Sequence, residues 1–162
     1  MTIDRWEIIS AIASGVSAIS SLIAILFVVK QLDSSNQIAK AQLINELERD
    51  ISLHAPTYTL LTMGNGSWPQ NNMDLTDEQR VAILNYISFF ERVNGIINTK
   101  VLKIEEIDDM FGGRFFYLFN NPKVKEVMDA REIKPYLESV RSLYGKWKKY
   151  REDNNLDIPL NY

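Results

Sequence analysis

The stretch IISAIASGVSAISSLIAILFVV, Ile8–Val29, decides the architecture that the sequence predicts. It contains no charged residue, and as an α-helix it would span about 33 Å, enough to cross a hydrocarbon core of roughly 30 Å. More than half of its side chains are Ile, Leu, Val or Phe, which favour membrane insertion. We therefore expect residues 1–30 to form a single N-terminal transmembrane anchor.

Two alternatives to a retained anchor stay open. The tripeptide Val16-Ser17-Ala18 resembles the cleavage site of a signal peptide, although the preceding residues include Asp4 and Glu7 instead of a positive cluster. The apolar run also continues well beyond Ala18, which favours retention. The other alternative is a buried helix in a wholly soluble protein, for which the remaining chain would have to supply a large core.

The charges that flank the anchor predict its orientation. Lys30 and Lys40 follow the apolar run, whereas Arg5 is the only basic side chain before it. Because cytoplasmic flanks carry an excess of Lys and Arg, we expect the N-terminus outside and the C-terminal domain in the cytoplasm.

Small residues gather on one side of the anchor. At about 100° per residue, Ser10, Ser14, Ser17, Ser21 and Ala24 fall within an arc of roughly 80°. Small residues let membrane helices approach closely, and hydroxyls can bond across the contact, so this face predicts self-association into a homo-oligomer. Alternatively, each hydroxyl bonds a carbonyl of its own helix and has no partner. The predicted association face consists of Ser10, Ala11, Ser14, Gly15, Ser17, Ala18 and Ser21.

The remaining chain predicts an all-α fold, a cytosolic bundle of about four to five helices over residues 31–153 with a loose tail over 154–162. Apolar residues recur at helical spacing after Lys30 until Pro56 interrupts them. Thr76 and Gln79 have the form of a capping box at the start of a helix, whose expected buried stripe is Ile83, Ile87, Phe90, Val93 and Ile97. Further helices are expected over 104–118, from Pro122, and over the segment that ends near Asp153.

The sequence contains none of the usual catalytic signatures. It has no cysteine and a single histidine, His54, which we interpret as a helix-end residue beside Pro56. The acidic residues between Glu105 and Asp109 match no calcium loop, and we interpret them as carboxylates at the positive end of a helix dipole. We therefore predict a protein that is not an enzyme and that has no metal or cofactor.

Two sets of charged residues are candidates for a binding or structural role. Glu91 and Arg131 each lie among apolar neighbours, which predicts a structural ion pair or an internal polar pocket. Basic residues alternate with aromatics near the C-terminus, which suits either binding of anionic lipid or another ligand, or a helix end whose aromatics pack inward. This second set is Lys146, Trp147, Lys148, Lys149 and Arg151.

Several short motifs resemble an uncharacterised bacterial family catalogued as domain of unknown function 4760. The matching residues are Phe90-Glu91 on a middle helix, Phe111-Gly112 at the end of an acidic helix, Arg131 before the last helix, and Trp147 within it. The resemblance implies a bacterial or phage-encoded protein with an N-terminal helix in the inner membrane. It implies no activity and no catalytic residue.

Three functions are compatible with these features. The first is a non-enzymatic, single-pass membrane protein that self-associates through its anchor and presents a helical bundle to an unknown protein or small-ligand partner. The second is a membrane-disrupting or pore-forming effector of cell defence, gated by a ligand at the bundle. The third, an enzyme acting on lipid or nucleotide, would need carboxylates that converge in a cleft. Membrane lipid is an expected partner of the anchor. Nucleic acid is not an expected partner, because the formal net charge of the chain is -3.

Overall fold

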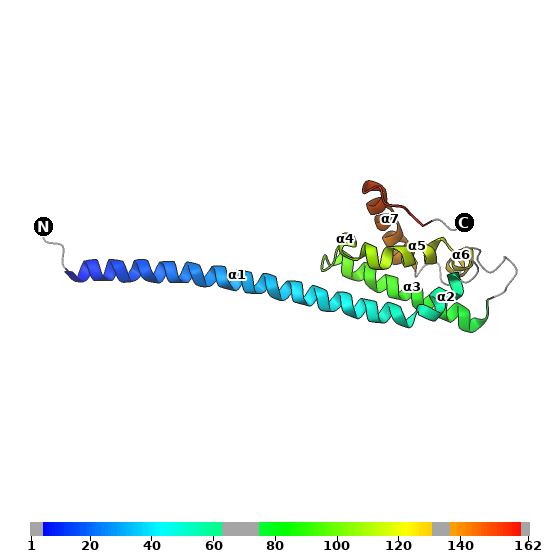
Figure 1. Ribbon diagram of the computed structural model, residues 1–162, viewed down its shortest axis with the longest axis horizontal. Helices are drawn as coiled ribbons and strands as arrows, with labels where there is room; N and C mark the ends of the chain where they lie inside the picture. The colour runs from blue at the N-terminus through cyan, green and yellow to red at the C-terminus, as the bar shows by residue number, and fades with distance from the viewer. Residues whose placement is uncertain (1–4, 63–74, 131–136, 160–162) are drawn as a thin grey trace. The chain divides into compact units, whose positions relative to one another are not determined.

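The computed structural model describes residues 5–62, 75–130 and 137–159, while the side chains of residues 5–22 and of Ala24 lie outside the described part. The chain divides into two compact units, Met1–Leu43 and Ile44–Tyr162. All regular secondary structure in the described ranges is helical, so the prediction of an all-α fold is confirmed (Figure 1).

The N-terminal unit consists of the first part of helix α1 (Arg5–Leu53). Its described apolar side chains lie open to the surroundings: Leu26 and Phe27 are 70% and 71% exposed. None of the described helices is both long and apolar enough to cross a membrane.

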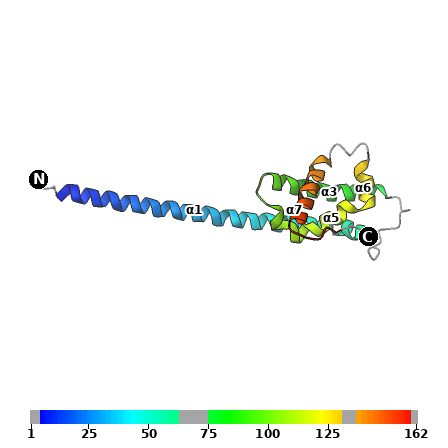
Figure 2. The same cartoon turned by 90° about the horizontal axis from the view of Figure 1, so that it is seen from above.

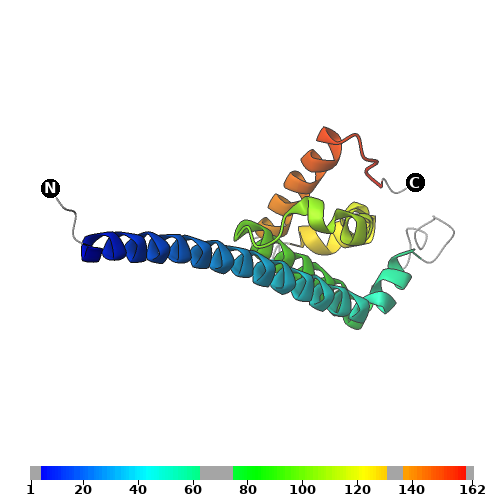
Figure 3. The same cartoon turned by 60° about the vertical axis from the view of Figure 1, so that its left-hand side comes forward.

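The C-terminal unit begins within α1, whose last turns bury Leu47 and Ile51 as the helical spacing predicts. The helix ends at Leu53, and α2 (Ala55–Thr62) follows at an angle, with Pro56 in its first turn (Figure 3). A proline is tolerated there because the N–H that it lacks would have no partner within the helix. The predicted interruption is therefore a change of helix direction.

Helix α3 (Asp77–Asn98) starts as the sequence predicts. The Thr76 hydroxyl accepts a hydrogen bond from the Gln79 amide at 3.2 Å, and the Gln79 side chain accepts one from the Thr76 amide at 3.0 Å. This reciprocal capping box satisfies two amides at the start of the helix. The predicted stripe is buried except for its last member, Ile97, which is half-buried: the buried members are Ile83, Ile87, Phe90 and Val93.

The region predicted as one helix over 104–118 is divided by a π-helical turn. Helix α4 (Ile104–Ile107) leads into the turn η1 (Asp108–Gly112), which continues as α5 (Gly113–Asn120). A π-helical turn changes the rotation of the chain about the helix axis, so the side chains before and after it point in directions that a regular helix would not give.

Two further helices complete the C-terminal unit. Asn121 caps α6 (Pro122–Asp129) by accepting hydrogen bonds from the amides of Lys123 and Val124. Helix α7 (Glu138–Asp153) crosses α3 and packs against it (Figures 1 and 2). It buries Val140, Leu143 and Trp147.

The chain turns back after α7 (Figure 3). Although residues 154–159 are irregular, two of their backbone carbonyls hold them against the helices. Arg151 donates to the Asp157 carbonyl at 2.5 Å, and the Asn120 side chain donates to the Pro159 carbonyl at 2.8 Å. This described part of the expected loose tail is therefore attached to the bundle.

The core of the unit is rich in aromatic rings. Phe115 of α5 lies at its centre, with its ring 4.7 Å from Trp147 and 4.9 Å from Phe90, measured between centroids. All three side chains are fully buried. These ring contacts join α3, α5 and α7 and bring the polar groups of η1 and α7 together.

Candidate functional site

A buried carboxylate connects η1 to α7. Asp108 is only 3% exposed. Its Oδ1 accepts a hydrogen bond from the Trp147 indole N–H at 2.5 Å and another from Arg151 Nε at 2.8 Å, while its Oδ2 accepts one from Arg151 at 3.2 Å. Because the guanidinium is charged and binds both oxygens, this is a strong, directional pair.

Because Gly112 has no side chain, there is room beside it for the Asp108–Arg151 pair. A Cβ at this position would lie 2.5 Å from Asp108 Oδ1 and 2.7 Å from an Arg151 nitrogen, closer than atoms can approach. The backbone of Gly112 has ordinary helical angles, so the requirement for glycine is steric. The steric requirement applies to Gly112 but not to Gly113, where a Cβ would meet nothing within 4 Å.

The Asp108 cluster has the properties of an architectural site. Arg151 also lies over the Phe116 ring, with its Cζ 5.5 Å from the centroid, and bonds the backbone of Asp157. Three donors from α7 bind the two oxygens of this buried carboxylate, as is typical of a structural ion pair. The cluster thus joins η1, α7 and the following segment.

The residues of the predicted C-terminal patch point in different directions. Trp147 is in the core, and Arg151 is paired with Asp108. Lys146 donates to the side-chain oxygen of Asn98 at 2.6 Å, and Lys148 lies 3.6 Å from Glu152. Lys149 is exposed. The arrangement matches the alternative in which the aromatics of a helix end pack inward, and lipid binding by the exposed lysines stays a prediction.

Glu91 lies half-buried on α3, and burial raises the pKa of its carboxyl above the ordinary value. Its predicted partner Arg131 is outside the described residues, so the ion pair stays a prediction. Self-association through the small-residue face of the anchor also stays a prediction. The backbone of this face belongs to α1, but its side chains lie outside the described part.

His54 is at the junction of α1 and α2, as its predicted helix-end position requires. Its amide donates to the Ile51 carbonyl at 3.0 Å, while its ring stacks on Tyr86 with 5.1 Å between centroids. Burial, with a smaller effect from the nearby Arg92 guanidinium, lowers the pKa of the imidazole. The ring contact, which the sequence does not reveal, fixes the junction to α3.

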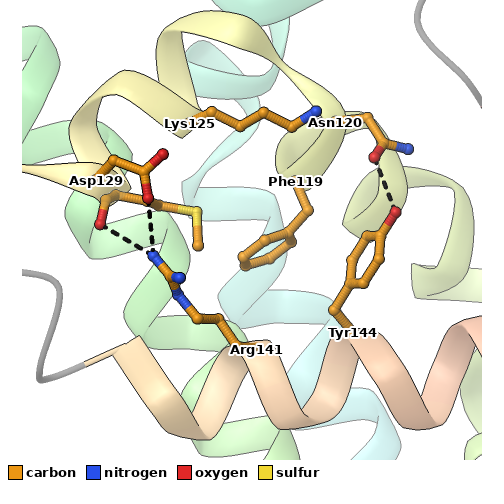
Figure 4. A pocket seen from close by; sticks show the side chains of 7 residues that line it. Phe119, Asn120, Lys125, Asp129, Arg141 and Tyr144 are labelled. Carbon is orange, nitrogen blue, oxygen red and sulfur yellow. Dashed lines mark hydrogen bonds and ion pairs between the residues drawn. The ribbon is translucent and has the colours of Figure 1, made fainter.

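An open pocket of about 280 Å³ is the most promising site for a ligand (Figure 4). Residues from α5, α6 and α7 line it: Phe119, Asn120, Lys125, Met128, Asp129, Arg141 and Tyr144. Arg141 donates to the Met128 carbonyl at 3.3 Å and to Asp129 Oδ1 at 3.1 Å. The Tyr144 hydroxyl donates to Asn120 Oδ1 at 3.0 Å. These bonds hold two polar groups at the wall of a partly apolar cavity.

Sequence reasoning did not identify this pocket. The two basic residues that line it, Lys125 and Arg141, lie on different helices and belong to no sequence motif. The one available signal was the basic character of the segment from Pro122 to Arg151.

Comparison with known proteins gives no relative: no family model, curated protein or solved structure matches the chain. The resemblance to domain of unknown function 4760 therefore stays a prediction from the quoted motifs.

Proposed function

We propose that the chain is a non-enzymatic, single-pass membrane protein that self-associates through the small-residue face of its anchor and presents the helical bundle to a partner. The observation that carries this proposal is the apolar surface of α1. Six bulky residues, Ile23 and Ile25–Val29, are each at least half exposed. Because successive residues of a helix point about 100° apart, this surface is apolar on all sides. Such a helix is stable when lipid or other protein surrounds it.

The end of this apolar surface supports the same proposal. Lys30 follows Val29 directly, and Asp33 comes one turn later on the same helix. A lysine at the end of a span can extend its ammonium group to the lipid headgroups. The helix continues from there to Leu53. We therefore place the boundary of the membrane near Lys30.

Alkaline carbonate extraction of membranes that contain the full chain tests the anchor. An integral protein stays in the pellet and is released by detergent. A matched variant, Val16→Lys with Ile19→Lys, places two charges near the middle of the apolar run, each costing about 2.5–3.5 kcal/mol at a helix centre. This variant should move to the supernatant. Release of the unaltered chain by carbonate would contradict the proposal.

The pocket of the bundle supports a second candidate, the ligand-gated membrane effector. In this candidate a ligand bound between α6 and α7 reorganises the anchors, and the serine face lines a pore. Vesicles loaded with a fluorescent dye distinguish the two functions. Dye release that Ser14→Leu and Ser17→Leu abolish would favour the effector, whereas intact vesicles would favour the interaction protein.

A further inference from the structure

The pocket between α5, α6 and α7 has hydrogen-bond donors that the bundle does not use. Lys125 is exposed and makes no hydrogen bond or ion pair with the described residues. Its side chain extends along one rim, opposite Arg141 and Tyr144 (Figure 4). Arg141 uses one terminal nitrogen for both of its bonds, so Nε and the other terminal nitrogen keep their hydrogens available.

The charges of the residues that line the pocket favour an anionic ligand. Asp129 offsets part of the Arg141 charge at 3.1 Å, while Lys125, one turn before Asp129 on α6, forms no ion pair with the described residues. Two cations and one carboxylate leave a local charge of +1, which favours an anionic occupant. The free donors lie on opposite sides, so an anionic group between them would join α6 to α7.

The other residues that line the pocket favour a ligand with a flat, apolar ring. Phe119 and Met128 are only 5% and 6% exposed and provide an apolar floor, while the Tyr144 ring forms a wall. Aromatic rings prefer to pack against other rings in stacked or edge-to-face geometry. The volume of about 280 Å³ is near the lower limit for ligand sites, so the occupant has about one ring and no long chain.

We propose that this pocket binds a small molecule in which one anionic group, a carboxylate or a phosphate monoester, is attached to a flat ring. The anion lies between Lys125 and Arg141, and the ring lies over Phe119 beside Tyr144. The binding site is complete within the C-terminal unit, so the proposal is independent of the membrane anchor.

Ligand-observed fluorine NMR on the detergent-solubilised full chain tests this proposal with two probes of equal shape. The probes are 4-fluorobenzoate, which is charged, and 4-fluorobenzamide, which is neutral. We expect 4-fluorobenzoate to bind about tenfold more tightly, the ratio that 1.4 kcal/mol of charge-assisted hydrogen bonding produces. Competition with phenyl phosphate and with inorganic phosphate then shows which anion is preferred and whether the ring is needed.

Two lysine variants locate the binding. Lys125→Met keeps the length of the side chain but removes its charge, and it should weaken 4-fluorobenzoate binding about tenfold with little effect on 4-fluorobenzamide. Lys100→Met makes the same change at an exposed position outside the pocket and should leave both affinities unchanged. Equal affinities for the two probes, or equal binding by the wild type and the Lys125→Met variant, would overturn the proposal.

Discussion

Replacing Gly112 by alanine tests whether the Asp108 cluster holds the bundle together. The added Cβ would lie 2.5 Å from Asp108 Oδ1 and 2.7 Å from Arg151, and neither group can easily move because both are almost buried. Overpacking of a core costs about 1–3 kcal/mol, and full loss of a buried ion pair costs about 3–5 kcal/mol. We expect Gly112→Ala to lower the free energy of unfolding by about 2–4 kcal/mol, because the new methyl group displaces the pair only in part.

The neighbouring Gly113 provides the control. Both glycines have right-handed helical angles, so alanine suits the backbone at either position. A Cβ at Gly113 meets nothing within 4 Å. Since alanine is more favourable than glycine in a helix by about 0.8–1 kcal/mol, Gly113→Ala should stabilise the protein slightly. Two adjacent and chemically identical substitutions should therefore have opposite effects.

Thermal unfolding of the full chain in detergent, followed by near-ultraviolet circular dichroism of the aromatic core, measures both variants. A change of 1 kcal/mol shifts the melting temperature by about 4 °C in a domain of this size. Gly112→Ala should melt about 8–16 °C below the wild type, and Gly113→Ala a few degrees above it. Equal shifts of the same sign would refute the steric argument, because helix propensity alone would then explain both.

Three further predictions concern the bundle. Asp108→Asn leaves the buried guanidinium without its counter-charge and should cost about 3 kcal/mol in urea unfolding; a loss below about 1 kcal/mol would show that the pair contributes little. Thr76→Ala removes the cap of α3 and should cost about 1 kcal/mol, whereas equal stability would mean that the capping box is dispensable. Because burial lowers the pKa of His54, the unfolded chain binds more protons below its ordinary pKa of 6.5, so stability should fall as the pH drops from 7. Burial raises the pKa of Glu91, so the contribution of this carboxyl to stability falls as the pH rises above its ordinary pKa of 4.5. His54→Phe keeps the stacked ring and should remove the loss of stability that His54 causes between pH 7 and 5.5. Urea unfolding at these two pH values measures this loss. The same loss in the wild type and in the variant would exclude His54 as its source.

Local sequence signals predicted much of the bundle. The capping box of Thr76 and Gln79 depends on residues three positions apart, and the proline that divides α1 from α2 acts on its own neighbourhood. The buried stripe of α3 follows from a single helical period. Such features need no knowledge of the tertiary fold.

The π-helical turn and the pocket depend on contacts that no local pattern encodes. Asp108 bonds Trp147 and Arg151, which lie 39 and 43 residues further along the chain. In sequence Asp108 was indistinguishable from the acidic residues beside it, which are typical of a helix start. The spacing of four residues from Asp108 to Gly112 and from Trp147 to Arg151 was visible, but only the packing of α7 on η1 gives it meaning.

The mass of the detergent-solubilised full chain, measured by light scattering with the detergent contribution subtracted, shows whether the protein self-associates. We expect a multiple of 18.7 kDa for the wild type. Ser14→Leu should reduce it towards the monomer, whereas Ser20→Leu should not, because Ser20 lies about 80° away from Ser10 around the helix and outside the association face. A monomeric wild type, or a mass that both variants leave unchanged, would contradict self-association through this face.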